Sequence, residues 1–119
     1  MATRIAFFDA KSYDRESFDE VNKDFNFDIR YYEERLSIST VPLAKGADVV
    51  CIFVNAECDA QVIDELVANG VKLIALRCAG FNNVDLKAAE GRIRVTRVPA
   101  YSPHAVAEYA VGIDAEFEP

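Results

Sequence analysis

The sequence predicts a doubly wound α/β domain, in which a five-stranded parallel sheet lies between two layers of helices. Five strand-like segments alternate with helix-like segments along the 119 residues, which is typical of parallel strands joined by crossover helices. Three of the strands are apolar on both faces, and the second and fifth alternate with charged residues. Buried central strands and half-covered edge strands then predict the strand order 2-1-3-4-5, the flavodoxin-like order.

The strands follow from their apolar patterns. The central strands are expected at 4–8, 49–54 and 71–76, where Lys72 is the one charged interruption beyond the start of the first strand. The edge strands are expected at 27–31 and 93–96, where apolar residues interleave with charged ones. Alternation of this kind predicts one covered and one wet face.

The helices follow from their start and stop signals. The first expected helix is capped by Ser12 and has Phe18, Val21 and Phe25 on one face. Three more are expected over 39–45 before Gly46, from Asp59 to Asn69-Gly70, and over 84–90 before Gly91. The last one is expected to start at Ser102-Pro103. No repeat or linker interrupts the pattern, so residues 1–119 are expected to form one domain.

Composition narrows the classes of function. The formal net charge is -7, which disfavours nucleic-acid binding and an anionic membrane surface. The longest apolar run, 49–54, is far too short for a membrane span, and the first residues resemble neither a signal peptide nor a transit peptide. Three cysteines without a Cys-x-x-Cys pair favour reduced thiols and a cytoplasmic location.

Several kinds of self-contained site are excluded by motif. No two of the five glycines are closer than ten positions, so neither a dinucleotide fingerprint nor a P-loop is present. His104 is the single histidine, and its spacing from the cysteines is unlike that of zinc ligands. No G-x-S-x-G accompanies it. We therefore expect no cofactor site and no metal site in this chain.

Ligands of such folds bind beyond the carboxyl ends of the strands. The segments expected at that edge are 9–12, 55–59, 78–83 and 99–103. The segment with Cys78, Ala79 and Gly80 is the most suggestive, because small residues before a helix let backbone N–H groups approach a carboxylate or phosphate. An ordinary turn that needs glycine remains the alternative.

Three further side chains are candidates for this edge, and each keeps a structural alternative. Arg77 ends the fourth strand and is expected either to stabilise an anion or to form an internal ion pair. Tyr101 either closes over a ligand or packs. His104, in the first turn of the last helix, is expected to be neutral if it acts as an acid or base, and is otherwise an inert surface residue.

Two long motifs resemble one known family. They are Ala-Leu-Arg-Cys-Ala-Gly-Phe-Asn-Asn-Val-Asp at 75–85 and Arg-Val-Pro-Ala-Tyr-Ser-Pro-His-Ala-Val-Ala-Glu at 97–108. With the strand at 50–55, they resemble the D-2-hydroxyacid dehydrogenases, in particular the fermentative D-lactate dehydrogenases, over about residues 5 to 112. The part that is matched is the family's substrate-binding or catalytic domain.

The resemblance implies specific roles for individual residues. It implies that the backbone amides of Ala79 and Gly80 hold the carboxylate of a small 2-keto or 2-hydroxy acid, next to Cys78. It also implies that Tyr101 contacts this substrate and that Phe53 lines the pocket for its side chain. The family uses NAD, but its cofactor domain and its catalytic Arg, Glu and His have no counterpart here, and His104 does not match that His.

The substrate-binding motifs are matched and the cofactor and catalytic residues are not, which leaves three possible functions. The first is a truncated relative that binds a small acid for non-redox chemistry such as isomerisation, dehydration, cyclisation or condensation. The second is a fragment of an NAD-dependent D-lactate dehydrogenase that is inactive alone. The third is a regulatory module that docks on a full-length relative. Because the family covers one sheet face with a helix that has no counterpart here, we also expect a homodimer, testable by light scattering.

Overall fold

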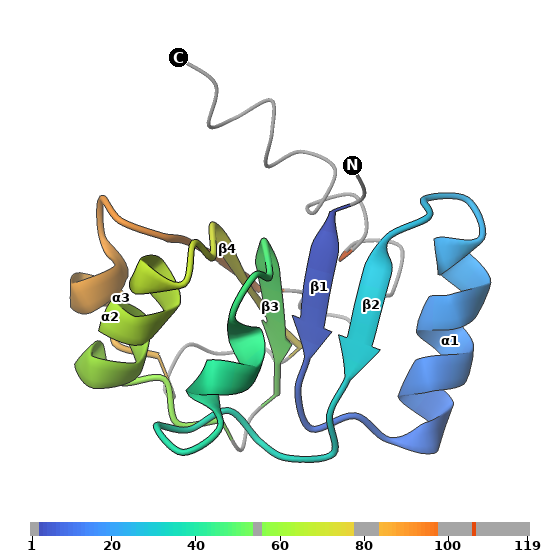
Figure 1. The fold of residues 1–119 in the computed structure, drawn as a ribbon, viewed down its shortest axis with the longest axis horizontal. Coiled ribbons are helices and arrows are strands. Elements are labelled where there is room, and N and C mark those ends of the chain that lie inside the picture. Colours follow the sequence, from blue (N-terminus) through green and yellow to red (C-terminus); the bar gives the residue numbers. More distant parts are fainter. Residues whose placement is uncertain (1–2, 54–55, 78–83, 98–105, 107–119) are drawn as a thin grey trace.

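The computed structural model describes residues 3–53, 56–77, 84–97 and 106. Within them a five-stranded sheet has the order β2-β1-β3-β4-β5, and every neighbouring pair is parallel. The strands are β1 (Arg4–Phe7), β2 (Asp28–Tyr31), β3 (Val49–Ile52), β4 (Leu73–Leu76) and β5 (Arg94–Arg97). The predicted fold class and strand order are therefore confirmed (Figure 1).

The helices between the strands are shorter than the sequence signals suggested. They are α1 (Ser12–Asn22), the 3-10 turn η1 (Val41–Ala44), α2 (Ala60–Ala68) and α3 (Leu86–Ala89). The carboxylate of Asp59 accepts a hydrogen bond of 3.0 Å from the Val62 N–H, so the predicted cap of α2 is confirmed. Of the helix predicted from Ser102 on, the described part contains only Val106, which is helical and fully buried.

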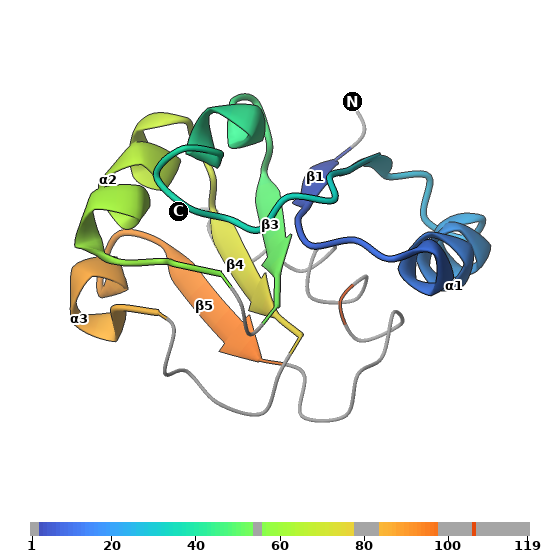
Figure 2. The ribbon, with the colours of Figure 1, turned by 90° about the horizontal axis from the view of Figure 1, so that it is seen from below.

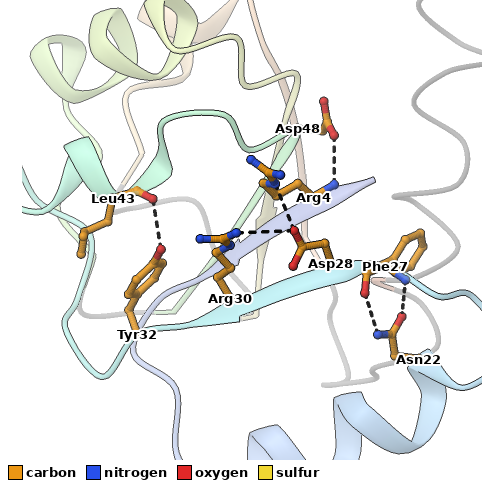
Figure 3. A network of polar contacts seen from close by, with 8 residues as sticks. All are labelled: Arg4, Asn22, Phe27, Asp28, Arg30, Tyr32, Leu43 and Asp48. Atoms are coloured by element: carbon orange, nitrogen blue, oxygen red, sulfur yellow. Dashed lines mark hydrogen bonds and ion pairs between the residues drawn. The ribbon is translucent and has the colours of Figure 1, made fainter. Parts of the chain in front are cut away.

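The start and end of α1 differ from the prediction. Lys11, not Ser12, is its N-cap residue, and the Lys11 N–H donates to the Asp14 carboxylate at 2.8 Å. The helix ends at Asn22, whose side chain makes hydrogen bonds of 2.7 and 2.9 Å with the N–H and C=O of Phe27 (Figure 3). These two hydrogen bonds lie in the turn between α1 and β2. Phe25 therefore lies outside the helix that was expected to include it.

The core has two parts, one on each face of the sheet, which makes three layers (Figure 2). Alternate residues of the central strands point to α2, α3 and η1 on one face, where Ile63 and Leu66 are fully buried. The other residues of the same strands pack with Phe18 of α1 and with Val106. β1, β3 and β4 are buried on both faces over almost their whole length. The homodimer stays a prediction.

The edge strands are half-exposed, as the alternation of charged residues predicted. At the amino ends of β1 and β2, Arg4 Nε lies 3.1 Å from Asp28 Oδ2, and the Arg4 N–H donates to the Asp48 carboxylate at 3.0 Å (Figure 3). These contacts fix the edge opposite to the one where a ligand is expected. No helix among the described residues has the length and apolar composition needed to cross a bilayer.

Candidate functional site

The candidate site lies at the carboxyl edge of the sheet. The arrowheads of β1, β2 and β3 point to this edge in Figure 1, and α1 begins there. Three described residues or pairs follow directly on the central strands: Phe8-Asp9 after β1, Phe53 after β3 and Arg77 after β4. In a doubly wound fold this is the edge at which ligands bind.

Arg77 is the charged group at the centre of this edge, and it is 4% exposed. Its Nη1 lies 3.5 Å from Oδ2 of Asp14, a carboxylate in the first turn of α1 with 2% of its side chain exposed. Its Nη2 donates to the backbone carbonyl of Phe8 and lies 3.5 Å from that of Asp9. Of the two readings of Arg77 that the sequence left open, the structure places it in an internal ion pair.

Two aromatic rings also contact the guanidinium. Its central carbon lies 4.3 Å from the ring centroid of Phe7 and 5.1 Å from that of Phe53. A cation this close to a ring is attracted by the negative charge density of the ring face. The same side chain therefore holds Phe53, which follows β3, beside the end of β4.

The turn between β1 and α1 has an unusual backbone. Asp9 has a φ of 56°, in the left-handed region that non-glycine residues enter at a cost and that Asp tolerates better than most. Its N–H donates to the Glu34 carbonyl at 2.8 Å, and its carboxylate lies 3.1 Å from Lys11 Nζ. Tertiary contacts thus hold this backbone in place, and such held conformations are often found at functional sites.

A cavity of about 150 Å³ opens between this turn and the ends of β3 and β4. It is lined by Asp9, Lys11, Tyr13, Asp14, Phe53 and Arg77. Its volume suits a molecule of a few heavy atoms. Its two acidic and two basic side chains pair with each other, so the cavity wall carries little net charge.

One polar atom at the site has no partner among the described residues. Arg77 Nε is buried and makes no hydrogen bond within that part of the chain. A buried donor without an acceptor is rare in folded proteins and calls for an explanation in each case.

The two described thiols are free and buried, and their surroundings disfavour the reactive thiolate. Burial raises the pKa of Cys51 to about 12, although the neighbouring Arg77 guanidinium opposes this shift. Burial, with a smaller contribution from Asp59, raises the pKa of Cys58 to about 12. Both thiols stay protonated at neutral pH, and a protonated thiol is a poor nucleophile and metal ligand. The described residues contain no group of three or more side chains that could hold a metal ion.

The residues predicted for the site fall into two groups. Phe53 and Arg77 line the same cavity. The segment with Cys78, Ala79 and Gly80, together with Tyr101 and His104, lies outside the described residues, so these assignments stay predictions. Sequence reasoning placed the 9–12 segment at this edge but selected no side chain in it. The acidic pair Asp9 and Asp14 around a predicted helix start was the available signal.

Comparison with known proteins gives one consistent family. The model of the D-isomer specific 2-hydroxyacid dehydrogenase catalytic domain matches residues 5–113. The chain is 57% identical to 2-hydroxyacid dehydrogenase homolog 1 of Schizosaccharomyces pombe over 111 residues, which are 92% of this chain and 33% of that protein. It is 48% identical to the D-lactate dehydrogenase of Escherichia coli, again over 92% of this chain, and 34% of that enzyme.

Solved structures agree with the sequence comparisons. The apo-structure of Escherichia coli D-lactate dehydrogenase superposes with a TM-score of 0.80 at 47% identity, over 92% of this chain and 35% of the enzyme. The Salmonella D-lactate dehydrogenase gives a TM-score of 0.79 at 46% identity, over 95% of this chain and 35% of that one. The chain thus spans about a third of the length of the relatives it matches.

Proposed function

The chain belongs to the D-isomer specific 2-hydroxyacid dehydrogenase family, and from this membership we propose that it binds a small 2-keto or 2-hydroxy acid at the carboxyl edge of its sheet. The observation that supports this most directly is the cavity between Phe53 and Arg77. It lies at the edge where the fold binds ligands, and its size suits an acid with a short side chain.

The proposed ligand contacts come from neighbouring strand ends. The backbone amides of Ala79 and Gly80 would hold the carboxylate, with Cys78 in the same segment, and Tyr101 would contact the ligand from a second segment. Phe53 would line the pocket for the ligand's side chain. Because the guanidinium of Arg77 is paired with Asp14, backbone N–H groups are better suited than Arg77 to hold the incoming carboxylate.

The described residues do not fit the NAD that the family resemblance implies. A dinucleotide-binding unit of this type places a glycine-rich phosphate turn between its first strand and helix. Here Asp9 and Asp14 occupy that turn, and their carboxylates already engage the Lys11 N–H and the Lys11 and Arg77 cations that would otherwise face a pyrophosphate. We therefore propose that this chain contributes substrate binding to a dehydrogenase reaction, and that hydride transfer needs groups beyond these 119 residues.

A non-redox reaction draws no support from the described residues. Arg77 was its candidate anion stabiliser, and the guanidinium is paired with Asp14 inside the fold. The acid–base candidates Tyr101 and His104 lie outside the described part of the chain, and so does any surface that they would give to a docking partner. Substrate binding is thus the function that the geometry supports best.

The test is a titration of the 119-residue chain with pyruvate and D-lactate, followed by NMR and calorimetry. We expect saturable shifts of the amides of residues 79 and 80 and of the Phe53 ring, and smaller ones with propionate, which lacks the 2-oxygen. Gly80→Val should abolish binding, because a branched side chain would block approach to these amides. The control for backbone strain away from the site is Gly91→Val: an added Cβ there has no neighbour within 4 Å, but the φ of +75° strains a valine, so its affinity is compared once circular dichroism shows that it is folded. Unchanged affinity in the Gly80 variant would exclude this segment as the site.

A further inference from the structure

Arg77 joins three segments that are far apart in the sequence. It holds the turn after β1 through the carbonyl of Phe8, 69 positions away, and the first turn of α1 through Asp14. It holds Phe53, after β3, through the ring. Its own backbone N–H donates to the Ile52 carbonyl at 2.9 Å. The ends of β1, β3 and β4 therefore meet at one side chain.

The guanidinium is committed to these protein contacts. One terminal nitrogen faces the Asp14 carboxylate and the other donates to the Phe8 carbonyl, while its plane lies near two aromatic rings. To grip a ligand carboxylate with both terminal nitrogens, Arg77 would have to give up its contact with the buried Asp14 or its hydrogen bond to the Phe8 carbonyl. Uncompensated buried charge is strongly unfavourable, so the arrangement favours a fixed guanidinium.

We propose that Arg77 is a positioning residue for the acid-binding site, and that the Arg77–Asp14 pair works as one unit. This pair sets the place of the Phe53 ring and of the Asp9 turn, both of which line the cavity. It also fixes the point from which the chain enters the segment at 78–80. The inference rests on the proposed function for the identity of the ligand, but the contacts that carry it are internal to the fold.

The two roles of Arg77 predict opposite results for Asp14→Asn. If Arg77 bound the ligand directly, loss of the Asp14 charge would release the guanidinium and leave the affinity for pyruvate unchanged or higher. If Arg77 instead positions the site, loss of the Asp14 charge leaves the guanidinium, and with it the Phe53 ring, less firmly held. Displacements of about 1 Å can cost up to about a hundredfold in function, so we expect the Kd for pyruvate to rise by about tenfold.

The experiment is a double-mutant cycle on the 119-residue chain, with pyruvate as the probe. Arg77→Lys and Asp14→Asn are made singly and together, and folding is checked by circular dichroism. We expect each single variant to weaken binding and the double variant to be no weaker than the worse single one, because residues of one unit are non-additive. Additive losses, or an unchanged Kd in Asp14→Asn, would overturn the proposal. If Arg77→Lys does not fold, the direction of the change in Kd for pyruvate in Asp14→Asn decides between the two roles of Arg77.

Two controls separate position from general instability. Leu66→Ala opens a hole in the core between α2 and the opposite sheet face, and Arg92→Met breaks an ion pair of 2.6 Å with Asp64 at the surface. Neither should change the Kd for pyruvate under conditions where the protein is folded. An equal rise of Kd in Leu66→Ala would mean that the Arg77 effect is only loss of stability.

A readout without ligand keeps this inference separate from the proposed function. If the wild-type chain gives no saturable response to pyruvate, the proposed ligand is wrong. The NMR spectra of unliganded Asp14→Asn then decide on Arg77. Changes that reach the Phe53 ring and the amides of residues 79 and 80 support the positioning role, whereas changes confined to residues 8–14 refute it.

Discussion

Replacing Arg77 by methionine should destabilise the fold strongly. Methionine keeps much of the apolar contact with Phe7 and Phe53 but leaves Asp14, of which 2% of the side chain is exposed, without its cation. It also removes the donor to the Phe8 carbonyl. Removing one partner of a buried ion pair typically costs about 3–5 kcal/mol. For a domain whose total stability is of order 5–15 kcal/mol, that is a large share.

The assay is urea unfolding followed by circular dichroism. With a slope of about 1.5 kcal/mol per molar urea, a loss of about 3 kcal/mol lowers the midpoint by about 2 M. The control is Arg92→Met, which breaks a pair whose side chains are 39% and 64% exposed. Exposed pairs contribute at most about 1 kcal/mol, so its midpoint should move by less than about 0.7 M.

A double variant tests the physical cause. In Arg77→Met with Asp14→Leu, neither charge of this buried pair remains, and apolar replacement of a buried pair is often close to neutral. We expect it to recover much of the lost stability, less about 1 kcal/mol for the lost hydrogen bond from the Lys11 N–H. The reasoning is refuted if Arg77→Met costs no more than the surface control, or if the double variant is less stable than Arg77→Met alone.

Two further predictions concern reactivity. At pH 8 the pKa values of about 12 for Cys51 and Cys58 leave about one thiol in ten thousand ionised, so peptide mapping after treatment with a thiol reagent should find both unlabelled until urea unfolds the chain. Because folding raises these pKa values, the two protonated thiols stabilise the native state up to about pH 9, and their contribution to the free energy of unfolding falls as the pH rises further. Fast labelling of the native chain would contradict the raised pKa values and with them this pH dependence. The pure chain should not oxidise NADH with pyruvate at 340 nm, and measurable turnover would show that it holds a cofactor site.

The fold could be predicted because burial leaves a direct record in the sequence. Strands with both faces covered, such as Val49–Ile52, are apolar throughout, and half-exposed β5 alternates with charges. The limits of α1 were harder, because they depend on single side-chain bonds. The Asp14 carboxylate accepts a hydrogen bond from the N–H of the N-cap residue Lys11, and the Asn22 side chain bonds to both backbone groups of Phe27. These bonds set the limits of α1 at other residues than the ones predicted, where Ser12 was expected as the N-cap and Phe25 as part of the apolar helix face.

The site could be predicted only as far as chain position decides it. Arg77 was found because it ends a buried strand, and strand ends meet at one edge of a parallel sheet, whereas Phe53 was named only from the family resemblance. The partner of Arg77 could not be found in this way. Asp14 looks like an ordinary acidic residue near the start of a helix, where acids are common on a solvated surface, and its burial exists only once β4 and α1 are in place.

The Arg77–Asp14 pair also explains why the start of the first helix should not be the group that holds the ligand's carboxylate. In doubly wound folds the start of the first helix attracts anions, through free N–H groups and the helix dipole. Here an internal carboxylate already accepts from the Lys11 N–H, and Asp9 adds a second negative charge beside it. Lys11 and Arg77 already pair with these carboxylates, so an incoming acid would have to compete with them for either cation. The backbone N–H groups that follow Arg77 in the chain are then the better place to hold it.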